Sequence, residues 1–273
     1  MTRTRAKHRV YSEVVGTTLV FLHGRHARSG DWVGAINQGL SAAERPPLPD
    51  DLAIFEMDYA DVLHDLLAGT DEQAPHPRQT SEHYERRQRL VRLSMDSFTH
   101  RPRSPYDFAP KEWVTKMIMT RMPEIQRYRA NPALRAAVRE NCLAQLPTGN
   151  IVLIAHSLGS VVAYDMLHYL PANTHVELLL TIGSPMARKP WRATLAPYRS
   201  QFPTAAVSSW INLVNTGDWI TAGDGIHLWY PQAIDTYANL GLGNHGETHY
   251  LASRPAGLVI GDAVVRAGSG VHP

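Results

Sequence analysis

A short segment around Ser157 has the residue types of a turn that presents a nucleophile. The segment 155–159 reads Ala-His-Ser-Leu-Gly, and it follows an apolar run and precedes a helical pattern. A strand-to-helix turn that exposes a nucleophile is so tight that it needs small residues two positions before and two after it. Ala155 and Gly159 meet this requirement. Ser157 is therefore a candidate nucleophile, and the alternative is an ordinary strand-helix turn.

The elements that must position this serine are short apolar runs of buried-strand composition. Five such runs lie at 17–22, 52–57, 150–155, 177–182 and 209–214. Their apolar residues are continuous rather than alternating, which is typical of strands covered by helices on both faces. Helical patterns at 132–146 and 158–170 each end before a proline. This alternation predicts an α/β fold with a mostly parallel central sheet, in which functional residues follow the carboxyl ends of strands.

Three motifs at strand ends together resemble the α/β-hydrolase superfamily. They are His23-Gly24, the segment 155–159, and the Thr-Ile-Gly-Ser-Pro segment at 181–185. In detail they are similar to bacterial lipase/esterase-like members, although Ala155 stands where the first glycine of the turn is usual. The resemblance covers most of the chain outside residues 60–130 and the N-terminal arm. It implies an α/β-hydrolase fold, a serine hydrolase that needs no cofactor, and the chain order serine, acid, histidine.

The resemblance places the acid after the strand that follows residue 185. Asp218 lies there, just beyond the apolar run at 209–214. Its role would be to orient the histidine and stabilise the imidazolium. The segment 215–218 (Asn-Thr-Gly-Asp) also has the composition of a plain turn. Asp224 and Asp235 are the alternative acids.

The histidine is expected on a later loop. Family members often place it directly before an aromatic-led final helix, and Tyr250-Leu251 fits that description, so His249 is favoured. His245 and His227 are the alternatives.

The resemblance also implies two backbone N–H groups that stabilise the oxyanion. Leu158 would supply one at the start of its helix, and Arg25 the other. His23, Gly24 and His156 are expected to line the substrate site. The side chains of Arg25, His26 and Arg28 either bind an acidic group of the substrate or are solvated loop charges.

Residues 60–130 do not fit the alternation of strands and helices. Helical patterns at 81–98 and 111–129 predict a helical cap inserted into one α/β domain that spans residues 1–273. Residues 76–140 carry 14 basic and 7 acidic side chains. Because the two signs are interleaved and match no recognition motif, solvated helix faces are expected rather than a nucleic-acid partner.

Composition excludes several classes of protein. The 273 residues are 44% hydrophobic and 19% charged, with one cysteine, Cys142. Disordered, collagen-like and disulfide-stapled proteins are excluded, and no metal-binding motif occurs. No segment reaches the roughly 18 apolar residues of a membrane span, and the interrupted apolar stretch near residue 20 is not typical of a signal peptide. A cytoplasmic protein is expected, and its oligomeric state stays open.

These residues predict a serine hydrolase that cleaves a carboxylic ester in a small-molecule acyl substrate, whose acyl chain length stays open. Ser157, Asp218 and His249 would form the triad. Thioester or amide hydrolysis and acyl transfer use the same groups and remain open. Two further classes are a catalytically silent binding protein of the same fold and a module whose basic insert docks on an acidic partner or membrane surface.

Overall fold

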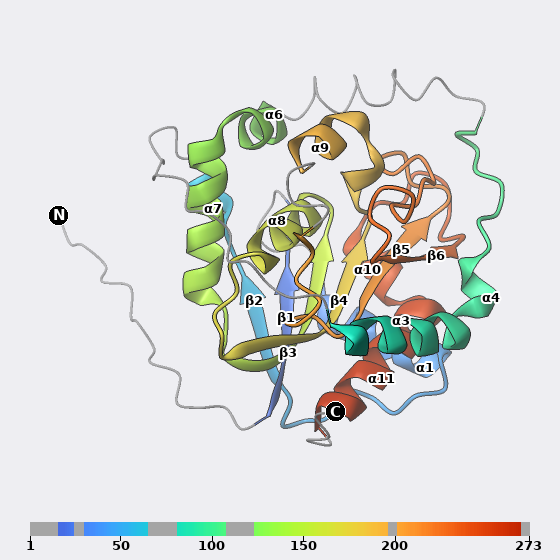
Figure 1. Cartoon of the computed structure of the whole chain (residues 1–273). Coiled ribbons are helices and arrows are strands. Elements are labelled where there is room, and N and C mark those ends of the chain that lie inside the picture. Colours follow the sequence, from blue (N-terminus) through green and yellow to red (C-terminus); the bar gives the residue numbers. More distant parts are fainter. Residues whose placement is uncertain (1–15, 25–29, 65–80, 108–122, 196–200, 269–273) are drawn as a thin grey trace.

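A computed structural model of the protein describes residues 16–24, 30–64, 81–107, 123–195 and 201–268. Its centre is a six-stranded sheet with the order β2-β1-β3-β4-β5-β6, and every neighbouring pair is parallel (Figure 1). The strands are β1 (Thr17–Leu22), β2 (Ala53–Met57), β3 (Gly149–His156), β4 (Thr174–Ile182), β5 (Trp210–Asn215) and β6 (Ile234–Ala238). The predicted α/β fold with a mostly parallel sheet is thus confirmed.

Helices cover both faces of this sheet. The described helices are α1 (Trp32–Ala42), α2 (Ala60–His64), α3 (Glu82–Ser94), α4 (Asp96–Thr99), α6 (Pro123–Ala130), α7 (Pro132–Gln145), α8 (Leu158–Leu167), the 3-10 turn η1 (Pro185–Ala187), α9 (Lys189–Thr194), α10 (Glu247–Leu251) and α11 (Arg254–Gly268). One hydrophobic core joins the sheet to α7 and α8, and a second joins its other face to α1, α10 and α11. The two cores explain why the strands are apolar throughout.

The chain reverses its direction of travel across the sheet between β1 and β3. It runs from β1 outward to β2 and then returns to form β3 on the other side of β1. The connections that leave the carboxyl ends of β1 and β3 therefore run in opposite directions across the sheet. This is a topological switch point, where open α/β sheets bind ligands. His23-Gly24 follows one of these strands and Ser157 the other.

The edge strand β6 was not predicted from the sequence. Two of its five residues, Ile234 and Thr236, are buried, and the other three are only partly buried. It pairs with β5 through the register Ile211–Ile234 to Asn215–Ala238. A short strand at an edge needs no continuous apolar run, so the pattern used for the other strands does not detect it.

The described part of residues 60–130 contains α2, α3, α4 and α6. Part of the expected helix at 111–129 lies outside the described residues. α3 packs at the amino ends of the strands, because Tyr84 Oη donates to Gln232 O at 2.6 Å and Gln88 Nε2 donates to Trp210 O at 3.2 Å. Segment 101–107 instead contacts the loop after β5, at the carboxyl edge. The predicted insert thus reaches both ends of the sheet.

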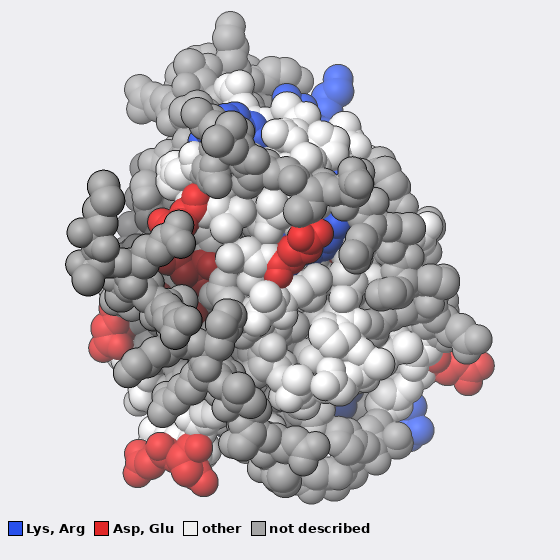
Figure 2. Space-filling model, turned by 90° about the vertical axis from the view of Figure 1, so that its left-hand side faces the viewer, with Lys and Arg blue, Asp and Glu red and all other residues white. Residues whose placement is uncertain are grey.

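Some basic side chains of the segment 76–140 form ion pairs with acidic side chains of the same chain. Arg87 pairs with Glu177, Arg101 with Asp107, and Arg139 with Asp165. On the side of the molecule seen in Figure 2, described acidic and basic side chains lie in small groups among uncharged residues. Within the described part of the chain, no helix is long and apolar enough to cross a membrane.

Candidate active site

Ser157 occupies a strained turn between β3 and α8. Its backbone has φ 53° and ψ −123°, although it is not glycine. Such a conformation costs of order 1–3 kcal/mol and persists where the surroundings impose it, often at functional sites. The turn lifts the half-buried serine from the end of a buried strand. This is the local geometry that the segment 155–159 predicted.

Close packing of backbones explains the small residues around Ser157. A Cβ atom at Gly159 would lie 2.3 Å from His23 O and 2.6 Å from Leu22 O, so α8 can approach the end of β1 only with glycine there. A Cβ atom at Gly24 would lie 3.2 Å from Ser157 Cβ. Ala155 is fully buried in the sheet. The first glycine of the usual pattern is therefore replaced by a residue that fits.

Ser157, His245 and Asp218 form a continuous hydrogen-bonded chain. His245 Nε2 lies 2.9 Å from Ser157 Oγ, and His245 Nδ1 lies 2.7 Å from Asp218 Oδ2. Because an ionised carboxylate only accepts, Nδ1 carries the proton and Nε2 accepts from the serine hydroxyl. Asp218 is fully buried, and its other oxygen accepts from Ile220 N at 2.8 Å. The three side chains are arranged as a nucleophile, a base and an orienting acid.

The histidine in this chain is His245, whereas the sequence favoured His249. His249 lies inside α10 with an exposed side chain, and among the described residues its ring contacts neither Ser157 nor Asp218. His245 precedes Gly246, which caps α10. The histidine of the site thus lies before α10 rather than directly before Tyr250, because α10 already begins at Glu247 and Tyr250 is the fourth of its five residues.

Asp224, Asp235 and His227 are engaged with protein groups away from Ser157. Asp224 lies 3.5 Å from Arg101 and from Arg188. Asp235 accepts from Ile226 N and from Asn212 Nδ2, both at 2.8 Å, and burial raises its pKa. His227 Nδ1 lies 2.7 Å from Ala233 O. The contacts of Asp235 and His227 connect the loop after β5 to the region of β6, and those of Asp224 lead to the insert and to the start of α9. None of them leads to the nucleophile.

His23 and His156 flank the site but point toward protein groups. His23 Nε2 lies 2.6 Å from Glu56 Oε1, and its ring packs edge-on against Phe21. His156 Nε2 lies 2.7 Å from the main-chain oxygen of His245. Burial, together with neighbouring His245 and His23, lowers the pKa of His156 well below its ordinary value. His156 is thus a neutral donor that holds the backbone of His245.

Asn215, at the end of β5, joins the two loops that carry Asp218 and His245. Its Nδ2 donates to Gly241 O at 3.0 Å and to Asn244 O at 2.8 Å. Its Oδ1 accepts from Gly217 N and Leu240 N, both at 3.0 Å. The fully buried amide therefore satisfies main-chain groups on both loops. Sequence reasoning noted Asn215 only as part of a turn.

Ser104 holds the acid loop from the side of the insert. Its buried hydroxyl lies 2.9 Å from Thr216 O and 3.4 Å from Ala222 O. Tyr106 Oη donates to Gly217 O at 3.3 Å, and Arg101 Nε donates to Gly223 O at 2.9 Å. These contacts join residues more than a hundred positions apart, so no local pattern could have found them.

The expected oxyanion donors are only partly described. Leu158 is the first residue of α8, so its N–H belongs to the first turn, which has no intrahelical acceptors. It also lies at the positive end of the helix dipole. Arg25 lies outside the described residues, which end at Gly24 on this side of the gap.

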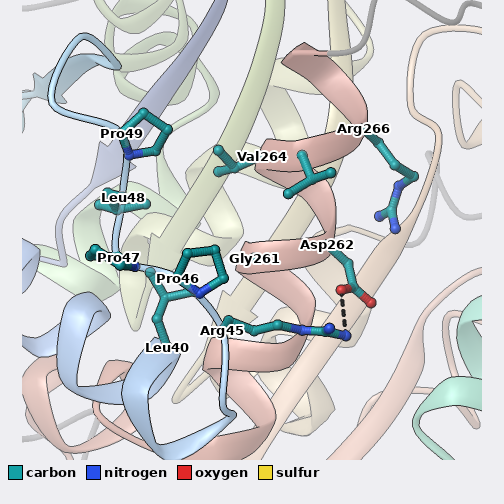
Figure 3. Close-up of a pocket in the computed structure, with 11 residues that line it drawn as sticks. Leu40, Arg45, Pro46, Pro47, Leu48, Pro49, Gly261, Asp262, Val264 and Arg266 are labelled. Carbon is teal, nitrogen blue, oxygen red and sulfur yellow. Dashed lines mark ion pairs between the residues drawn. The ribbon is translucent and has the colours of Figure 1, made fainter.

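A pocket with a mostly apolar lining lies away from this constellation. It has a volume of about 450 Å³ and lies between residues 46–49 and α11, beside the Arg45–Asp262 ion pair (Figure 3). Ser157, Asp218 and His245 do not line it. Among the described residues, no group of three or more His, Cys, Asp or Glu side chains is placed to hold a metal ion.

The chain is an α/β protein with a parallel sheet, and its Ser-His-Asp constellation lies at the carboxyl edge. Comparison with models of known protein families and with curated proteins found no match.

Proposed function

We propose that the protein is a serine hydrolase of the α/β-hydrolase type that cleaves a carboxylic ester through an acyl-enzyme intermediate. The observation that carries the proposal is the hydrogen-bonded chain from Ser157 through His245 to Asp218, with Ser157 in a strained turn. It favours a hydrolase over a silent binding protein, because packing alone requires neither this order of donors nor a strained serine.

In the first half of the reaction, Ser157 Oγ attacks the carbonyl carbon while His245 Nε2 takes the hydroxyl proton. The resulting imidazolium is stabilised by Asp218, which accepts from Nδ1. The proton then passes to the departing alkoxide, and the alcohol leaves. In the second half, His245 takes a proton from water, the hydroxide attacks the acyl group, and the proton returns to Ser157 as the carboxylic acid leaves.

The remaining parts of the proposal rest on the sequence. Leu158 N–H is the proposed first oxyanion donor and Arg25 N–H the second. Residues 60–130 are the proposed cap, and their contacts with the acid loop through Ser104 support a placement beside the site.

Hydrolysis of p-nitrophenyl esters of increasing acyl length tests the proposal. The matched pair His245→Ala and His249→Ala separates the two histidines. We expect His245→Ala and Ser157→Ala to lose at least about a thousandfold in kcat/KM and His249→Ala to stay within about twofold. Loss of activity in His249→Ala alone, full activity in Ser157→Ala, or no turnover of any ester by the folded wild type would contradict the proposal.

A further inference from the structure

Tyr250 contacts the carboxylate that orients His245. Its Oη lies 2.7 Å from Asp218 Oδ2, the same oxygen that lies 2.7 Å from His245 Nδ1. The tyrosine comes from α10, five positions after His245, and its side chain is fully buried. One oxygen of Asp218 thus accepts from both a phenol and an imidazole.

The direction of the phenol hydrogen bond follows from its other neighbour. Asn215 N–H donates to Tyr250 Oη at 3.3 Å, so the phenol proton is directed to Asp218. Burial and the neighbouring Asp218 carboxylate raise the pKa of Tyr250 well above its ordinary value. The phenol therefore stays a neutral donor across the working pH range.

Two donors on one oxygen compete for its charge. A hydrogen bond from Tyr250 disperses part of the negative charge of Asp218, so the carboxylate stabilises the imidazolium of His245 less strongly. The same bond, together with the one from Ile220 N to Oδ1, fixes the orientation in which the carboxylate meets His245 Nδ1.

We propose that Tyr250 is a positioning residue of this triad, whose hydroxyl orients Asp218 and tunes how strongly Asp218 stabilises the imidazolium of His245. The inference rests on the proposed function for its effect on catalysis. Its effect on the titration of His245 does not depend on turnover. The ring of His245 also faces that of His156, with 4.8 Å between the ring centroids, and the substitutions below leave His156 in place.

The substitution Tyr250→Phe removes only the hydroxyl. We expect the acid limb of kcat/KM against pH to move up by roughly half to one pH unit, because the imidazolium is then better stabilised. The NMR titration of the His245 ring should move by the same amount without any substrate. The matched control is Tyr128→Phe, which removes a buried hydroxyl that lies 3.5 Å from Asp165 Oδ2 and should leave both titrations unchanged.

An unchanged His245 titration in folded Tyr250→Phe, or an equal shift in Tyr128→Phe, would overturn the inference. A shifted titration in a protein that hydrolyses no ester would keep the inference and contradict the proposed function. If Tyr250→Phe does not fold, 3-fluorotyrosine placed at position 250 serves instead. It is a stronger donor, so the titration must move to lower pH, and no movement or an upward one would overturn the inference.

Discussion

The Nε2 atom of His156 lies 2.7 Å from the main-chain oxygen of His245. The residue directly before the nucleophile thereby holds the residue proposed as its base. Because a carbonyl oxygen only accepts, Nε2 must carry the proton. The buried ring is held neutral, since burial lowers its pKa well below 6.5.

This predicts a specific loss of stability in acid. The unfolded chain binds a proton at His156 near pH 6.5, whereas the folded protein does so only at lower pH. The contribution of neutral His156 to the free energy of unfolding is therefore fully present above about pH 6.5 and is lost as the pH falls below that value. Denaturant unfolding at pH 7.5 and 5.5 should show wild type losing more stability than His156→Gln, by up to about 1.4 kcal/mol per pH unit. Equal losses in the two proteins would contradict the assignment.

Asn215→Ala should weaken both loops of the site at once. It removes two hydrogen bonds that Nδ2 donates and two that Oδ1 accepts, all with main-chain groups, at an expected cost of about 2–4 kcal/mol in the free energy of unfolding. The matched control is Asn212→Ala, a buried asparagine of the same strand that binds Asp235. Both variants should be less stable, but only Asn215→Ala should lower kcat in the folded state. A similar fall in kcat for Asn212→Ala would refute the special role of Asn215.

Ser104→Ala tests the contact between the insert and the acid loop. Loss of its hydrogen bond to Thr216 O should loosen the loop that carries Asp218. We expect kcat to fall roughly three- to tenfold, equivalent to about one hydrogen bond, with KM little changed. Ser94→Ala is the control, because that hydroxyl bonds within its own helix, to Val91 O. A change confined to KM would instead indicate that Ser104 acts on the substrate.

Sequence patterns predicted the parts of this molecule that depend on local composition. Continuous apolar runs gave β1 to β5, and the small residues around Ser157 gave the turn after β3. The choice between His245 and His249 depends on where α10 begins and which of its faces turns inward, and spacing does not determine either. The contacts of Asn215, Ser104 and Tyr250 join distant segments, so they become visible only in the folded chain.

The central claim is that Ser157 is an activated nucleophile. The most direct measurement is the intact mass of wild type and Ser157→Ala after incubation with a fluorophosphonate, with peptide mapping of any adduct. We predict a single adduct on wild type, located at Ser157, and none on the variant. An adduct that persists in Ser157→Ala, or no adduct on folded wild type, would contradict the claim.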